Sequence, residues 1–168
     1  MKKLLIGLLV FGFTTQFYAQ VINEGMLPEV IVRATNYKYL NSVDNSEAAV
    51  SVQFLQDVAA KYDIRSSEFY EDGDDSYRIY FYIPDGKIVA AYDRNGKILY
   101  TIEKFKNVAL PNEVVQSVAK KFPGWEIAKD VYKVNYDVKR GPEKQYKIVL
   151  ENGKEKMRIK VDDKGVFL

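Results

Sequence analysis

The sequence predicts an α+β fold built as a tandem repeat, in which each copy is one helix followed by about four antiparallel strands. Two observations predict this fold. The spacing of apolar residues changes from a helical period to a two-residue period twice along the chain. Turns rich in Gly, Asn and Asp separate the runs that have the two-residue period. We expect the copies to span residues 46–104 and 105–168, each with its helix laid on one face of its strands.

The first copy begins with a helix predicted from Ser46 to Tyr62. One stripe of this helix is apolar and is expected to face the strands. The stripe comprises Val50, Phe54, Leu55, Val58 and Ala59. The opposite, polar side comprises Gln53, Gln56, Asp57 and Lys61. The expected strands of this copy are Glu68–Tyr70, Tyr77–Ile83, Lys87–Asp93 and Lys97–Glu103.

The second copy begins with a helix predicted from Leu110 to Phe122. Pro111 suits an early helical position, because its missing N–H would have no partner there in any case. Apolar and polar residues then alternate, and Asn152-Gly153 is a strong hairpin signal. The expected strands of this copy are Tyr132–Val138, Tyr146–Leu150 and Met157–Val161.

Residues 1–19 have the features of a secretory signal peptide. Lys2 and Lys3 precede the apolar run Leu4–Phe13, and the polar segment after it ends in the small residue Ala19. The apolar run is shorter than the ~20 residues that span a bilayer, which argues against an uncleaved anchor helix. The protein is therefore expected to be periplasmic or secreted, with no stable membrane span after removal of the signal.

Residues 20–45 are expected to form an N-terminal arm or edge strand plus a loop. Leu27–Val32 is a short run of β type, and short Val/Ile runs are usually strands. Asn36–Ser46 is polar and carries tyrosines, so it is expected to be a connecting loop.

Composition excludes several kinds of chemistry. The chain has no His and no Cys, which removes Ser-His-Asp and Cys-His nucleophiles and the usual zinc ligands. It carries 25 basic and 23 acidic residues, and Lys2 and Lys3 lie in the signal peptide, so the remainder is balanced. That balance argues against a general binder of nucleic acid or membrane surfaces. We expect no enzyme activity and no cofactor.

A family resemblance rests on the motifs around the second helix. Four stretches carry it: Val108-Ala109-Leu110-Pro111, Phe122-Pro123-Gly124-Trp125, Tyr146–Gly153 and Met157–Gly165. They resemble the PepSY-like (β-lactamase-inhibitor-like) periplasmic proteins of Bacteroidetes-type bacteria. The resemblance implies helices on one side of a curved antiparallel sheet, with the other side open. In the inhibitor proteins that open side grips a partner protein. This chain lacks their cysteines, so inhibition of a β-lactamase is not carried over.

The candidate binding residues follow from strand alternation. In Tyr77–Ile83, Tyr80 and Tyr82 alternate with residues expected to face the helix, so they should project onto the open side of the sheet. Tyr and Arg are favoured at the centres of protein interfaces. Such tyrosines can equally serve to cover a sheet face. The full candidate set is Arg78, Tyr80, Tyr82, Lys133, Lys147, Arg158 and Lys160.

The densest acidic cluster is a candidate of a different kind. Its oxygen ligands could bind calcium, but their spacing does not fit the helix–loop–helix pattern, and a solvated turn is the simpler interpretation. The cluster comprises Glu71, Asp72, Asp74 and Asp75.

Two binding or catalytic functions remain open from the sequence, beside a purely structural role in the cell envelope. The first is a non-catalytic exported module that binds a protein or peptide of the cell envelope through the open sheet face. The alternative is a periplasmic protein that binds a small ligand or glycan, or a weak hydrolase that uses carboxylates such as Asp137 and Glu151. The absence of histidine favours the first.

Overall fold

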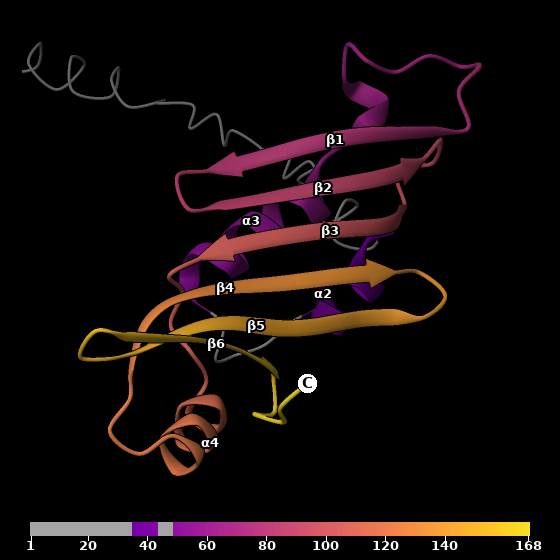
Figure 1. The fold of residues 1–168 in the computed structure, drawn as a ribbon. Helices are drawn as coiled ribbons and strands as arrows, with labels where there is room; N and C mark the ends of the chain where they lie inside the picture. Colours follow the sequence, from indigo (N-terminus) through magenta and orange to yellow (C-terminus); the bar gives the residue numbers. More distant parts are fainter. Residues whose placement is uncertain (1–34, 44–48) are drawn as a thin grey trace, which may run out of the picture.

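A computed structural model describes residues 35–43 and 49–168. Its centre is one six-stranded antiparallel sheet in which the strands follow chain order, β1-β2-β3-β4-β5-β6 (Figure 1). The strands are β1 Ser76–Ile83, β2 Gly86–Asp93, β3 Ile98–Lys106, β4 Glu126–Asp137, β5 Gly141–Asn152 and β6 Glu155–Asp162. The helical elements described are α2 Tyr37–Val43, α3 Val50–Lys61, the short 3₁₀ helix η1 Ile64–Ser66, and α4 Asn112–Lys121.

The predicted tandem repeat of a helix plus about four strands is wrong. The strands form one continuous sheet, because β3 and β4 pair from Tyr100↔Asp137 to Lys106↔Val131 and join the two halves. The helices are few and small, and only the broad α+β class agrees with the prediction. Glu68–Tyr70, expected as a strand, lies in a turn closed by a hydrogen bond from the Tyr70 amide to the Ser67 carbonyl.

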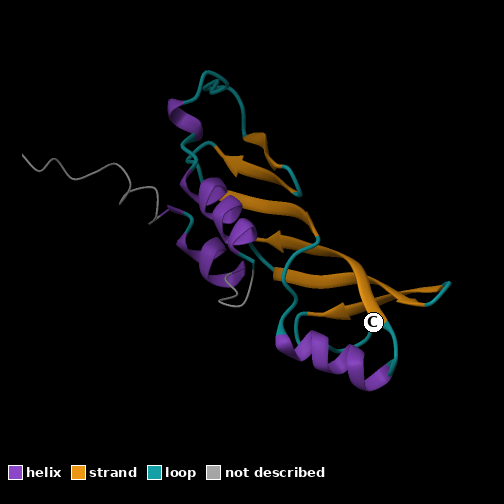
Figure 2. Ribbon diagram, turned by 90° about the vertical axis from the view of Figure 1, so that its left-hand side faces the viewer, coloured by secondary structure: helices purple, strands orange, loops and turns teal. Residues whose placement is uncertain are grey.

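Two helices pack side by side on one face of the sheet. Figure 2 shows α2 and α3 against the same side of the strands, with α4 beyond them at the β4–β6 end. The expectation of a loop at Asn36–Ser46 is wrong over Tyr37–Val43, which is α2. Tyr39 and Val43 lie four residues apart on one face of this helix, and each is only 1% exposed. Burial of these two side chains stabilises the helix, although the segment is otherwise polar.

The buried side of α3 differs from the predicted stripe. Val50 is 83% exposed and Phe54 is 59% exposed, whereas Gln56, expected on the polar side, is buried. The stripe is rotated because it must meet both α2 and β2, not the strands alone. The buried residues of α3 are Val52, Leu55, Gln56, Ala59 and Ala60.

Stacked aromatic rings form part of the core beneath the helices. The rings of Tyr132 and Tyr146 stack with centroids 4.5 Å apart, and Phe105 stacks on Tyr132 at 6.4 Å. The Tyr132 hydroxyl is buried and has no hydrogen-bond partner among the described residues. A buried polar group without a partner is destabilising.

Replacement of Tyr132 by Phe should therefore raise the free energy of unfolding, by about 1 kcal/mol, because it removes only the unpaired hydroxyl. Tyr92→Phe is the matched control. The Tyr92 hydroxyl donates to the Ala59 carbonyl at 2.6 Å, so this change should lower the free energy of unfolding by about 1 kcal/mol. Urea unfolding of both variants measures the two changes. An equal loss of unfolding free energy in both would contradict the absence of a hydrogen-bond partner for Tyr132.

Some expectations concern residues outside the described part of the chain. The signal peptide at 1–19 and the run Leu27–Val32 both lie there. Within residues 35–43 and 49–168, every helix is too short or too polar to cross a bilayer.

Candidate functional site: the open face of the sheet

Strand register divides the sheet side chains into two sets. Residues that are opposite each other on neighbouring antiparallel strands point to the same side. Phe81, Ile88 and Phe105 face the helices and are buried in the core. Their neighbours along each strand face the other side, on which no helix lies in the described part of the chain (Figure 2). We call that side the open face.

All of the candidate binding residues lie on the open face. Tyr80 is opposite Val89, and Tyr82 is opposite Lys87. On the far strands, Lys147 is opposite Lys160. The same pairings place Arg78, Lys133 and Arg158 on this side. The structure thus brings these residues onto one surface, although they span the whole width of the sheet.

The end of this surface on β1 is aromatic, and we call Arg78, Tyr80 and Tyr82 the aromatic end. The rings of Tyr80 and Tyr82 stack with an interplanar angle of 7°, and they are 53% and 66% exposed. The Arg78 guanidinium donates to the Tyr100 hydroxyl at 3.1 Å and so spans Ala91, its cross-strand neighbour. The hydrogen bond to Tyr100 raises the pKa of Arg78, which keeps its charge fixed.

The remainder of the open face is strongly basic. Lys87, Lys104 and Lys133 are opposite one another on three neighbouring strands. Like charges directly opposite each other destabilise a sheet. Eight cations of this surface, all on β2 to β6, make no ion pair with a described residue. They are Lys87, Lys104, Lys106, Lys129, Lys133, Lys147, Arg158 and Lys160.

Sequence reasoning missed Lys87, Lys104, Lys106 and Lys129. A signal for three of them was present, because Lys87 precedes the core residue Ile88, and Lys104 and Lys106 flank Phe105. Lys129 was hidden by a bulge between Ile127 and Lys129, which changes the alternation of β4.

Three of the acidic groups at the margins of the open face are already engaged, whereas Glu126 and Glu143 are exposed there. The Asp137 carboxylate accepts hydrogen bonds from the amides of Lys139 and Arg140, and these bonds hold its pKa below the usual value. Asp162 accepts from the amides of its own turn in the same way. Glu151 pairs with Lys156 at 2.7 Å. A lowered pKa is the opposite of what a general acid requires, so Asp137 is a turn cap.

Shallow hollows lie along this surface. One of about 360 Å³ lies over β4 to β6, with Val131 and Val149 in its lining and Lys147, Arg158 and Lys160 around them. Another, of about 270 Å³, lies by the β1–β2 turn, between Tyr82 and the side chains of Lys87, Lys104 and Lys106. Side chains of a bound partner could enter both.

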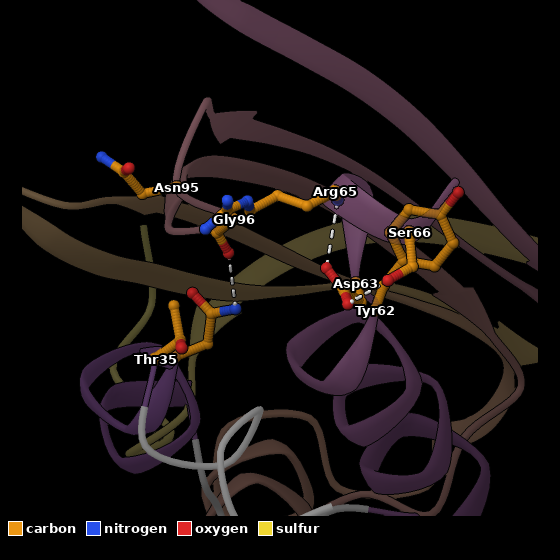
Figure 3. Close-up of a pocket in the computed structure, with 8 residues that line it drawn as sticks. Thr35, Tyr62, Asp63, Arg65, Ser66, Asn95 and Gly96 are labelled. Carbon is orange, nitrogen blue, oxygen red and sulfur yellow. Dashed lines mark hydrogen bonds between the residues drawn. The ribbon is translucent and has the colours of Figure 1, made fainter. Parts of the chain in front are cut away.

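A polar cavity of about 470 Å³ lies elsewhere, at the end of α3 (Figure 3). The Asn36 amide donates to the carbonyls of Ala60 and Gly96 and accepts from the Ile98 amide. Asp63 caps η1 by accepting from the Arg65 amide and the Ser66 hydroxyl (Figure 3). Asn36 thus joins backbone segments that are distant in sequence, and Asp63 caps a local turn, so these polar groups serve the fold at this junction.

A buried carboxylate lies under the helices. Glu103 is 1% exposed and accepts hydrogen bonds from Tyr39 at 2.9 Å, Thr101 at 2.7 Å and Gln56 at 2.8 Å. Burial raises the pKa of Glu103 against the opposing effect of these bonds. The group joins α2, α3 and β3 and has no path to the open face, because it points to the helix side.

The acidic cluster does not form a metal site in the described residues. Glu71, Asp72, Asp74 and Asp75 are exposed, and no group of three or more acidic side chains within residues 35–43 and 49–168 is placed to hold a metal ion. One of these carboxylates, that of Asp75, forms an exposed ion pair with the Arg94 guanidinium at 3.7 Å.

No family model, curated protein or solved structure matches this chain. The resemblance to PepSY-like proteins therefore stays a prediction from the motifs alone.

Proposed function

We propose that the protein is a non-catalytic, exported binding module that recognises a protein or peptide partner through the open face of its sheet. The observation that carries this proposal is the combination of stacked, exposed tyrosines with cations that lack an ion-pair partner, on one surface that no described element covers. Tyrosine and arginine are enriched among the residues that dominate the energetics of protein interfaces.

The aromatic end has the properties of an anchor. Tyr80 and Tyr82 are already held parallel by their strand, so little rotamer freedom is lost when a partner covers them. Ile102, which is 52% exposed, extends the apolar surface two strands further through Val89. An exposed apolar row of this kind indicates an interaction site.

The test is retention of a partner from envelope extract by the immobilised protein and by a Tyr80→Ala/Tyr82→Ala double variant. The wild type should retain a partner at physiological salt. The variant should retain at least about tenfold less of it, because the removed rings supply more than about 1.4 kcal/mol of binding free energy. Both sites are exposed, so the free energy of unfolding should change by less than about 1 kcal/mol.

The control is Phe54→Ala, which removes an equally exposed ring from α3. It should leave retention unchanged. Loss of the partner in the control, or equal retention by the tyrosine variant, would refute the open face as the binding surface.

A further inference from the structure

We propose that the partner segment is an acidic extended peptide, in which aliphatic side chains alternate with carboxylates on the side that meets β4 to β6. This inference rests on the proposed function and specifies the chemistry of its ligand. The basic end of the open face is Lys129, Lys133, Lys147, Arg158 and Lys160.

The side chains of β4 on the open face alternate between cations and a valine. Lys129, Val131 and Lys133 follow one another on the open face, so a valine lies between two cations. Successive positions on one side of a strand are about 6.6 Å apart, and an extended peptide presents its own side chains at the same repeat. A carboxylate, an aliphatic group and a second carboxylate at every second residue would therefore match the three positions.

The neighbouring strands continue the pattern. Lys147 and Val149 follow each other on β5, and Lys160 and Arg158 lie opposite them on β6. Val131 and Val149 belong to the same hollow of about 360 Å³, whose remaining side chains include those three cations. An aliphatic side chain seated between the valines would have a cation on each flank for the adjacent carboxylates.

Charge complementarity points to an anionic partner. Lys147 and Lys160 repel each other across the strands and have no acidic partner among the described side chains. Because the rest of the molecule balances these charges, the field is local to the face. A partner that carries carboxylates relieves the repulsion and gains attraction, which falls off over about 10 Å at 0.1 M salt.

A nucleic acid fits this end less well than a peptide. Single-stranded nucleic acids bind basic grooves through stacking of bases on aromatic rings. The exposed rings of Tyr80 and Tyr82 lie on β1, which is separated from β5 by three strands, or about 19 Å between strand axes. The lining near Lys147 and Arg158 is aliphatic, which suits leucine or valine rather than a base.

The probe is a labelled synthetic peptide in which glutamate and leucine alternate at every second position with serine between them. A comparison peptide has the same composition, with the glutamates and leucines gathered in separate blocks. By fluorescence anisotropy, the purified protein should bind the alternating peptide at least about tenfold more tightly than the block peptide. Binding should weaken as salt rises from about 50 to about 200 mM. Equal affinity for the two peptides would overturn the inference.

Charge reversal locates the site. Lys147→Glu/Arg158→Glu should weaken binding of the alternating peptide at least about tenfold. The matched control, Lys97→Glu/Lys120→Glu, changes the net charge equally at exposed positions in the β2–β3 turn and on α4. If both reversals weaken binding equally, net charge alone acts and the inference fails.

A neutral pair, Lys147→Gln/Arg158→Gln, is measured alongside because it adds no new charge to the sheet. It should also weaken binding, and unchanged affinity of this folded pair would overturn the inference. An oligothymidylate and phosphatidylcholine vesicles with phosphatidylglycerol are the competing ligands. Tighter binding to either than to the alternating peptide would likewise overturn it.

The two proposals fail separately. If Tyr80→Ala/Tyr82→Ala loses its partner while the wild type binds neither peptide, the acidic-peptide inference fails and the proposed function stands. If the alternating peptide binds as expected while the tyrosine variant retains its partner in full, the acidic-peptide inference stands and the aromatic end is not the anchor.

Discussion

Gly165→Ala should lower the free energy of unfolding by about 2–5 kcal/mol, the sum of a left-handed backbone conformation and an overpacked contact. Gly165 has φ +78, and a Cβ placed there would lie 2.5 Å from Ser117 Oγ and 2.7 Å from the Glu113 carbonyl oxygen. Both neighbours belong to α4, so the C-terminal turn fits against this helix only without a side chain.

The expected loss of stability is large because the C-terminal turn also holds α4 in place. Phe167 packs edge-to-face on Phe122 with centroids 5.7 Å apart, and the Lys121 ammonium lies 3.8 Å from the Phe167 ring centre. These contacts attach α4 to the end of the chain, so displacement of the turn would loosen them together.

Gly124→Ala separates the two causes. Gly124 also has positive φ, +81, but nothing lies within 4 Å of the added Cβ. Its loss should be only about 1–2 kcal/mol, from backbone strain alone. Chemical denaturation of both variants gives the comparison, and similar losses would show that the contact with α4 contributes nothing.

Glu103→Ala should lower the free energy of unfolding by about 3 kcal/mol or more, because it leaves buried donors without an acceptor. The donors are the Tyr39 hydroxyl, the Gln56 amide and the Thr101 hydroxyl. They come from α2, α3 and β3, so the variant should also weaken the attachment of the helices to the sheet. Thermal unfolding measures the loss, and a loss below about 1 kcal/mol would contradict the network.

The pH dependence of stability gives a second, independent expectation for Glu103. Burial raises its folded pKa above the unfolded value of 4.5, so the folded protein holds the proton to higher pH than the unfolded chain. This contribution to stability is fully present below about pH 4.5 and is lost as pH rises through the folded pKa.

Glu103→Gln removes that titration while keeping a side-chain oxygen as an acceptor. The variant should therefore gain stability relative to the wild type as pH rises from about 4 to about 7. Unfolding free energies at the two pH values test the sign. A gain of the wild type over the variant across this interval would mean that the folded pKa of Glu103 is lowered.

The strands were largely predictable, and their assembly was not. Alternation found Tyr77–Ile83 and Tyr146–Leu150, both within observed strands, because a two-residue period is a local property of the chain. The pairing of β3 with β4 is set by contacts distant in sequence, and the apparent repeat suggested two units where the structure has one sheet. Alternation along one segment carries no information about its neighbour.

The helix layer was harder to predict for a related reason. Gln56 and Glu103 each look solvent-facing in their own segments, yet they are buried as hydrogen-bond partners. Polar side chains of this kind form hydrogen bonds between elements that are distant in sequence. Neither segment alone therefore indicates that they are buried. The expected loop is the helix α2 for a similar reason, because tertiary contacts bury Tyr39 and Val43.

The open face was partly predictable. Alternation placed Tyr80, Tyr82 and Lys147 on one side, and the register agrees with that placement. The balanced net charge, however, concealed how many cations share that side, because charge totals do not record direction. Lys87 and Lys104 became part of the surface only when β2 and β3 were paired.

Photo-crosslinking from two positions tests the central claim most directly. A photoreactive phenylalanine analogue is placed at Tyr82 on the open face or at Phe54 on α3, both highly exposed aromatic sites. After irradiation in envelope extract, we expect a discrete crosslinked partner from position 82, competed by the alternating acidic peptide, and none from position 54. The same partner from position 54, with none from position 82, would contradict binding through the open face.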